Sequence, residues 1–171
     1  LHALVDVEGF GPVNVFGTHL SAVFSDIPYP GEGTWEEEQA TQIADVLAYI
    51  ETRTEPGDPV VLLGDFNTGP AGALYQAEIA ANYELLTAGM LTNPYVEADD
   101  ARCTFCGDNP LVGGDAAVVI DHVFTRNVEA TAEAERILDG PIVVDVDGSE
   151  TTTALSDHYG VTLSLTRDAG E

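Results

Sequence analysis

The sequence contains no lysine, and five arginines stand against 30 acidic residues. With a formal net charge of −25, it has no basic surface of the kind that neutralises the phosphates of a nucleic acid. This lack argues against a polyanionic partner. An acidic surface that serves solubility or high salt is nevertheless the stronger interpretation, because net charge bears on solubility more than on a binding site.

Long apolar runs are also lacking, since none approaches the ~18 residues that a membrane-spanning helix requires. Residues 1–8 alternate apolar and polar like a strand, without the basic and then apolar segments of a signal peptide. A chain that opens inside a strand is expected to be part of something longer. The 171 residues, 44% of them apolar, suffice for one domain, or part of one, with a real core.

Cysteine is scarce, and both copies lie in the segment Cys103-Thr104-Phe105-Cys106. Such a pair could be a redox centre, half of a zinc site or a local disulfide. Zinc would need two more ligands, and no second CxxC or HxxxH follows. The redox interpretation lacks a strand that leads into a helix. A local disulfide is therefore favoured, which would suit a secreted protein.

Apolar periodicity and turn residues predict strands with a few helices between them. The predicted strands cover residues 2–8, 12–20, 60–63, 117–124, 129–137, 141–146 and 160–165. The predicted helices cover residues 35–53, where Thr34 is the expected N-cap, and residues 71–81. Most of the stretch 85–117 and the Gly/Ser/Thr-rich segment after 146 are expected to be irregular.

This order of elements predicts an α/β sandwich in which helices cover sheets. The strand at 60–63 is a continuous apolar run, so it is expected to be buried on both faces.

Polar residues that could carry chemistry lie where the predicted strands end, and loops can converge there on one cleft. Asp65 and Asn67 could hold a hard cation and orient a phosphate oxygen or water, or they could simply cap a turn. Asp157 would suit a metal and His158 a general base, although a surface loop explains an isolated Ser-Asp-His equally well.

Three further residues are weaker candidates by themselves. Asp121 directly follows apolar residues, where a carboxylate needs a partner. His19 also follows an apolar strand and could be structural. Gln42 shares a helix face with Gln39, and either amide could reach the cleft or face water.

Taken together, the chain resembles the endonuclease/exonuclease/phosphatase superfamily over residues 2–165. Five segments carry the resemblance in the family's order: GTHL at 17–20, QATQ at 39–42, GDFN at 64–67, IDHVF at 120–124 and SDH at 156–158. The resemblance implies a four-layer α/β sandwich of two mainly antiparallel sheets flanked by helices. It further implies hydrolysis of a phosphodiester with Mg²⁺, for which Mn²⁺ and Ca²⁺ are alternatives.

The resemblance also implies roles for single residues. His19 would contact the scissile phosphate, Asp65 would orient the attacking water and bind metal, and Asn67 would bind phosphate and metal. Asp121 would support the catalytic His158, which acts as general base or phosphate contact. The implied metal ligand of the SDH segment is Asp157, and the implied helix residue at the substrate is Gln42.

The chain departs from the family's pattern in two ways. Gln39 stands where the family usually has arginine, which is expected to remove a charge from the helix surface without touching the chemistry. More importantly, residues 1–171 match the C-terminal part of a single such domain. The resemblance implies that the family's N-terminal half, with an early asparagine and the glutamate that is the principal metal ligand, lies outside these residues. The isolated chain is therefore expected to bind Mg²⁺ weakly and to be inactive.

The substrate is left open between four hypotheses. The first is a secreted phospholipase C of the neutral sphingomyelinase type, because residues 17–22 and the segment from Thr104 to Leu111 resemble that branch. A zwitterionic lipid headgroup would also suit a chain with few basic residues better than a nucleic acid. The alternatives are an endonuclease of the deoxyribonuclease or abasic-site type, a sugar or inositol phosphate phosphatase, and a non-catalytic scaffold. Membrane-surface contact by exposed apolar residues at 23–35 would favour the lipid hypothesis.

Overall fold

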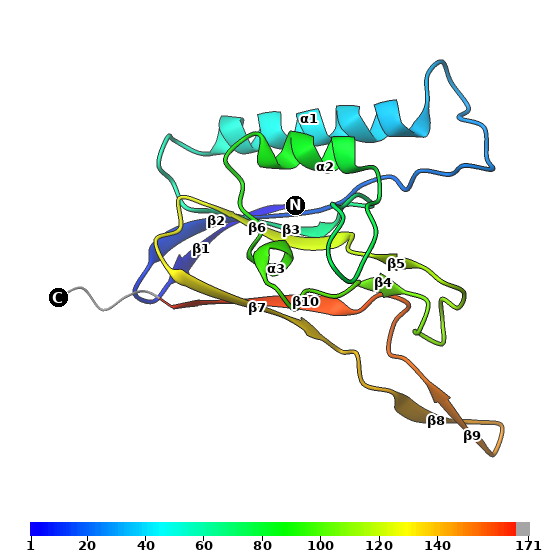
Figure 1. The fold of residues 1–171 in the computed structure, drawn as a ribbon. Helices are drawn as coiled ribbons and strands as arrows, with labels where there is room; N and C mark the ends of the chain where they lie inside the picture. The colour runs from blue at the N-terminus through cyan, green and yellow to red at the C-terminus, as the bar shows by residue number, and fades with distance from the viewer. Residues whose placement is uncertain (167–171) are drawn as a thin grey trace.

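The structure, a computed structural model, describes residues 1–166 and has a mixed α/β architecture (Figure 1). Four strands form the main sheet in the order β1 (His2–Val7), β2 (Gly11–His19), β3 (Val60–Asp65) and β6 (Asp121–Arg126). β2 and β3 run parallel, whereas β1 and β6 are antiparallel to their neighbours. The C-terminal ends of β2 and β3 therefore share one edge of the sheet with the N-terminal end of β6.

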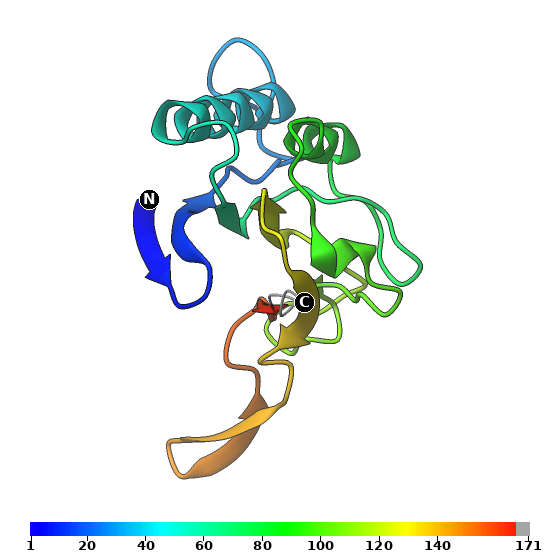
Figure 2. The ribbon, with the colours of Figure 1, turned by 90° about the vertical axis from the view of Figure 1, so that its left-hand side faces the viewer.

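One face of this sheet is covered by α1 (Trp35–Arg53) and α2 (Ala80–Thr87) (Figure 2). The predicted bounds of α1 are confirmed. Thr34 closes a capping box, since its hydroxyl accepts the Glu37 N–H while the Glu37 carboxylate accepts the Thr34 N–H. Ile43 and Ile50 turn toward the sheet and are fully buried.

The main core lies between these helices and the sheet. Its buried members are Phe16, Leu20, Ile43, Ile50, Val60, Leu62, Phe66, Tyr83, Leu86, Leu91 and Phe124. On β3, Val60 and Leu62 enter this core, but Leu63 points the other way and is 39% exposed. The prediction that β3 is buried on both faces is therefore wrong for residues 1–166, because these residues cover its second face only in part.

The predicted helix over residues 71–81 is wrong. Residues 73–75 are bends, and Gln76 and Glu78 form bridges to Val118 and Gly69, so α2 begins only at Ala80. Tertiary pairing has overridden the local helix propensity of this alanine-rich segment. The stretch predicted as irregular contains α3 (Pro94–Glu97) and the short strand β4 (Phe105–Cys106). The strand predicted from residue 117 begins with β5 (Ala117–Val118).

On the other side of the sheet from α1 lie β7 (Thr131–Ile137) and β10 (Gly160–Thr166), which pair antiparallel (Figure 1). A hairpin of β8 (Ile142–Val146) and β9 (Ser149–Thr153) projects away from the body of the molecule. The irregular structure expected after residue 146 is therefore wrong for β9. The turn at Asp147-Gly148 has positive φ at both residues, as in a two-residue hairpin turn. Within the described residues, no helix is long and apolar enough to cross a membrane.

Candidate active site

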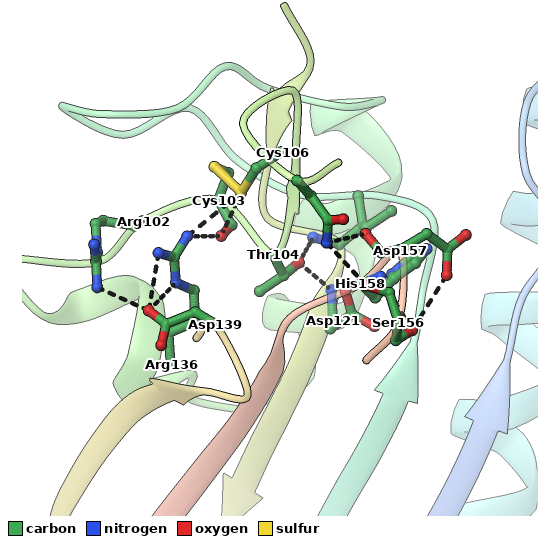
Figure 3. Close-up of a disulfide and its surroundings, with 12 residues drawn as sticks. Arg102, Cys103, Thr104, Cys106, Asp121, Arg136, Asp139, Ser156, Asp157 and His158 are labelled. Atoms are coloured by element: carbon green, nitrogen blue, oxygen red, sulfur yellow. Dashed lines mark hydrogen bonds and ion pairs between the residues drawn. A yellow bond between two sulfur atoms is a disulfide. The ribbon is translucent and has the colours of Figure 1, made fainter. Parts of the chain in front are cut away.

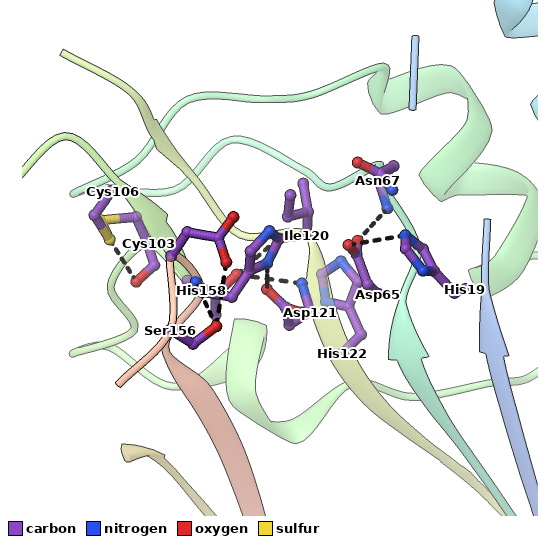
Figure 4. Close-up of polar contacts among 12 residues, drawn as sticks. His19, Asp65, Asn67, Cys103, Cys106, Ile120, Asp121, His122, Ser156 and His158 are labelled. Atoms are coloured by element: carbon purple, nitrogen blue, oxygen red, sulfur yellow. Dashed lines mark hydrogen bonds and ion pairs between the residues drawn. A yellow bond between two sulfur atoms is a disulfide. The ribbon is translucent and has the colours of Figure 1, made fainter. Parts of the chain in front are cut away.

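The main sheet brings polar residues from three strands together at one edge (Figure 4). His19 pairs in register with Asp65, and Asp65 pairs with Asp121. Because register partners point to the same face, the three side chains form a row on the face opposite α1. The expectation that Asp121 extends the strand 117–120 needs correction: β5 stops at Val118, and β6 begins anew at Asp121.

His158 reaches this row from the loop that precedes β10. Its Nδ1 donates a hydrogen bond to Oδ2 of Asp121 over 2.9 Å. This bond raises the pKa of His158, against the opposing effect of burial. No hydrogen bond engages Nε2 of His158 within residues 1–166, so this nitrogen is left for water or substrate.

Asp65 lies at the centre of the row and is half-buried. Burial raises the pKa of its carboxyl group, and the nearby Asp121 adds to the rise, while the N–H of Asn67 and the two histidines oppose it. Nε2 of His19 lies 3.4 Å from Oδ2 of Asp65, and the His19 side chain is 74% exposed. His19 thus sits at the open side of the row, and its contact with phosphate stays a prediction.

Asn67 has a left-handed backbone, with φ of 48°, a conformation that asparagine tolerates better than most residues. Its N–H donates to Oδ1 of Asp65, and its side-chain Nδ2 donates to the carbonyl oxygen of Leu20. These bonds orient the side chain beside Asp65. The predicted role in binding phosphate and metal would rest on Oδ1 of Asn67.

A group of potential metal ligands exists in the described residues. Ligand atoms of Asp65, Asp121 and His158 all lie within 4.8 Å of one another. Asp157 does not belong to this group: it is exposed, and its carboxylate accepts a hydrogen bond from the Ser156 hydroxyl. Of the predicted ligands, Asp65 is thus grouped with Asp121 and His158, and ligation by Asn67 and Asp157 stays a prediction.

The two glutamines of α1 both face the protein rather than bulk water. Gln42 is half-buried, and its amide bonds the N–H and hydroxyl of Ser21 and the carboxylate of Glu38. Its predicted contact with substrate remains a prediction. Gln39 was expected at the helix surface, but it is fully buried. Its amide donates to the carbonyl oxygens of Ser21 and Asn67.

Sequence reasoning did not identify two buried residues that hold the Asp121–His158 pair. The Thr104 hydroxyl accepts the N–H groups of Ile120 and Asp121. The side chain of Asn109 donates to the carbonyl oxygens of Ser156 and Asp157. The only signal in the sequence was their place in a segment that resembles one branch of the family.

The predicted disulfide between Cys103 and Cys106 is confirmed (Figure 3). It closes a small loop around Thr104 and Phe105. The Thr104 carbonyl oxygen accepts the N–H of Tyr159, and the Phe105 ring centroid lies 5.1 Å from that of His158. The disulfide therefore constrains a segment that contacts both members of the Asp121–His158 pair.

His122, the other histidine at this end of β6, faces the core and not the row. It donates from Nε2 to the carbonyl oxygen of Thr68 and accepts at Nδ1 from the side-chain amide of Asn93. Burial lowers the pKa of His122 to about 4. With both nitrogens engaged in the interior, His122 is a structural residue.

Comparison with known proteins places this geometry in context. A model described as the Endonuclease/Exonuclease/phosphatase family matches residues 2–158. Among solved structures, the beta toxin of Staphylococcus aureus superposes with a TM-score of 0.70 at 19% identity, over 95% of this chain and 55% of the toxin. Sphingomyelinase C from Streptomyces griseocarneus gives 0.64 at 22% identity, over 97% of this chain and 56% of that one.

A mannosyl-6-phosphatase from Bacteroides thetaiotaomicron has the same fold, with a TM-score of 0.54 at 17% identity, over 91% of this chain and 51% of that one. A variant of the beta toxin contains bound magnesium ions. No curated protein matches the chain. The chain spans about half the length of the solved structures that it resembles.

Proposed function

Because the chain belongs to the endonuclease/exonuclease/phosphatase family, we propose that its strand-end site hydrolyses a phosphodiester with the help of a divalent cation. The observation that carries this proposal is the hydrogen bond between His158 and Asp121 beside the carboxylate of Asp65. An acid–base pair and a second carboxylate at one sheet edge have the composition needed to activate and orient water.

The residues present fit a hard cation such as Mg²⁺. Asp65 and Asp121 are register partners on the neighbouring strands β3 and β6, and the repulsion between their carboxylates helps to raise the pKa of Asp65. Asp65 and Asp121 would hold the cation, whose positive charge would relieve this repulsion, and oxygen ligands of this kind suit Mg²⁺. When bound, the ion would supply positive charge to the phosphate and to the leaving oxygen. Asp157 and Asn67 remain proposed ligands beyond this group.

The chain's own residues account for the handling of water and substrate. Asp121 holds Nδ1 of His158 as a donor, so the neutral imidazole carries its lone pair at Nε2, where it can take a proton from water. Asp65 would orient that water, and His19 would donate to a phosphate oxygen at the open side of the row. Asn67 would complete the phosphate contacts.

We further propose that a second sheet completes the domain. The face of the main sheet that carries the polar row also exposes apolar side chains, with Val5 41% and Leu63 39% exposed. The solved structures of this fold are about twice as long as the region that the chain matches. A second sheet on this face would bury these residues and bring further metal ligands to the row.

Among substrates, a zwitterionic lipid of the sphingomyelin type is our proposal. Two similar structures are a sphingomyelinase and a toxin, and the net charge of −25 disfavours a polyanion. Phe24 and Ile27 are exposed at 45% and 54% in the loop between β2 and α1, as contact with a membrane surface would require. The disulfide supports a secreted protein.

The test is metal-dependent turnover by the full-length gene product. Phosphocholine release from sphingomyelin vesicles, nicking of supercoiled DNA and phosphate release from mannose 6-phosphate should be measured with Mg²⁺ and with EDTA. We expect lipid hydrolysis that EDTA abolishes and that falls at least a hundredfold in His158→Gln. Asp6→Asn, an exposed carboxylate on β1, is the control and should retain activity. DNA nicking or sugar phosphate hydrolysis instead would identify a different substrate and contradict the lipid proposal. Inactivity on all three substrates would refute the proposal that the protein is a hydrolase.

A further inference from the structure

A pocket lies between the loop that joins β2 to α1 and the segment that precedes α2. The loop runs past the N-terminal end of α1 (Figure 1). Aromatic and aliphatic side chains line the pocket together with two carboxylates: Phe24, Tyr29, Trp35, Ile79, Glu36 and Glu78. None of the polar residues of the row lines it, so it is a separate site.

The aromatic rings of this pocket are arranged around Trp35. The ring centroids of Phe24 and Tyr29 lie 5.3 Å and 5.1 Å from that of Trp35, and both rings are nearly perpendicular to the Trp35 ring. The indole N–H donates to the carbonyl oxygen of Ile27, which fixes the ring in the loop. Edge-to-face contacts hold the three rings together. A ring face that these contacts leave open would attract a cation.

Glu78 is the second feature that points to a cation. Its side chain forms no hydrogen bond or ion pair with the described residues, and burial raises the pKa of its carboxyl group. A partly desolvated carboxylate without a partner is costly unless a cation approaches it. The four arginines of residues 1–166 lie elsewhere, in contact with Tyr49, Asp139 and Glu51. No basic group of the described chain therefore competes for this position.

Both walls of the pocket are anchored beside Asn67. Val23, on one wall, lies three residues after Leu20, whose carbonyl oxygen accepts the Asn67 side chain. Three residues of chain reach about 11 Å at most. On the other wall, the carbonyl oxygen of Glu78 accepts the Thr68 hydroxyl, one residue after Asn67. The two walls of the pocket are thus tied to the chain on either side of Asn67.

We propose that this pocket binds a quaternary ammonium group, through the rings of Phe24, Tyr29 and Trp35 and the carboxylate of Glu78. The apolar rings do not suit a strongly hydrated metal cation, but they suit a cation whose nitrogen carries methyl groups. The pocket would select the cationic end of a choline phosphodiester whose phosphate lies at the polar row. This role in specificity rests on the proposed function, whereas binding of the cation does not.

Trp35 is the only tryptophan of the chain, so its fluorescence reports on this pocket alone. We would titrate the 171-residue protein with choline at constant ionic strength. The control ligand is 3,3-dimethylbutan-1-ol, a neutral molecule of the same shape. Saturable quenching by choline but not by the neutral alcohol is expected. Equal responses to both ligands, or no response to choline, would overturn the proposal.

Two variants make the test specific. Glu78→Gln should weaken choline binding about tenfold, because it removes the partly buried charge. Glu84→Gln, which neutralises an exposed carboxylate on α2 outside the pocket, should leave binding unchanged. Circular dichroism would verify that both variants are folded. Undiminished binding by a folded Glu78→Gln would overturn the assignment.

Sphingomyelin vesicles added to the same protein distinguish the source of the ammonium group. A change in Trp35 emission that choline reverses by competition supports a lipid headgroup, and binding of choline alone supports a soluble ligand. The two proposals also fail separately. Choline binding without metal-dependent hydrolysis would support the cation site and refute the proposed function. Hydrolysis without choline binding would support the proposed function and refute the cation site.

Discussion

Nδ1 of His158 lies 2.9 Å from Oδ2 of Asp121, although the two residues are 37 positions apart in the chain. This contact ties the loop before β10 to the main sheet and sets the imidazole next to Asp65. The proposed chemistry depends on it, because Asp121 both fixes the tautomer of His158 and stabilises its protonated form.

Replacing Asp121 by Asn should lower the pKa of His158, because the hydrogen bond to the Asp121 carboxylate is the main reason that this pKa is raised. The protonated imidazole is then less stable, so His158 loses its proton at a lower pH than in the wild type. Histidine NMR titration in EDTA measures this shift directly. Hydrolysis by the full-length protein should fall at least a hundredfold. An unchanged His158 titration would contradict the pairing.

Reduction of the Cys103–Cys106 disulfide should loosen the support of this pair. The segment between the cysteines contacts Tyr159 through Thr104 and His158 through Phe105. We expect faster amide hydrogen exchange at Asp121 and Tyr159 in the Cys103→Ser/Cys106→Ser double variant. Exchange in α1, which is remote from the disulfide, is the internal control. Uniform acceleration throughout the chain would indicate global destabilisation instead.

His122 should make the fold sensitive to mild acid. Its pKa is about 4 in the folded chain against 6.5 in the unfolded chain, so the unfolded state binds the extra proton. The contribution of His122 to the free energy of unfolding is fully present above pH 6.5 and is lost as the pH falls toward 4. The total loss is about 3 kcal/mol. Urea unfolding between pH 7 and 5 measures the loss. In His122→Gln, which cannot titrate, the dependence on pH should be flatter by about 2 kcal/mol over this range.

Gln39 should be important for stability, although it contacts no reacting group. Gln39→Leu leaves the carbonyl oxygens of Ser21 and Asn67 without their buried donor, and it removes one of the two acceptors of the Asn82 amide. We expect a loss of about 1–3 kcal/mol in the free energy of unfolding. Gln76→Leu, at an exposed position, should change stability by less than about 0.5 kcal/mol. Equal effects of the two substitutions would contradict the buried role of Gln39.

Local signals were sufficient where an element depends on its own residues. The capping residue Thr34 and the apolar spacing of α1 gave its bounds, and alternation gave β1 and β2. They failed where distant segments compete for the backbone. Glu78 and Gln76 are held by bridges to Gly69 and Val118, so no helix forms there despite the local helix propensity. The hairpin turn at Asp147-Gly148 was a local signal that the composition of its surroundings obscured.

The sequence by itself determined the order of the motifs, and with it the family, because short signatures at strand ends can be read without knowing how strands pair. It also identified His19, Asp65, Asn67, Asp121 and His158 as candidates. Only the tertiary structure decided which of them meet. Register across β2, β3 and β6 aligned three of them, and the return of β10 added His158. Asp157, beside His158 in sequence, stays outside this group, because the chain bends at Asp157 and its exposed carboxylate accepts a hydrogen bond from the Ser156 hydroxyl.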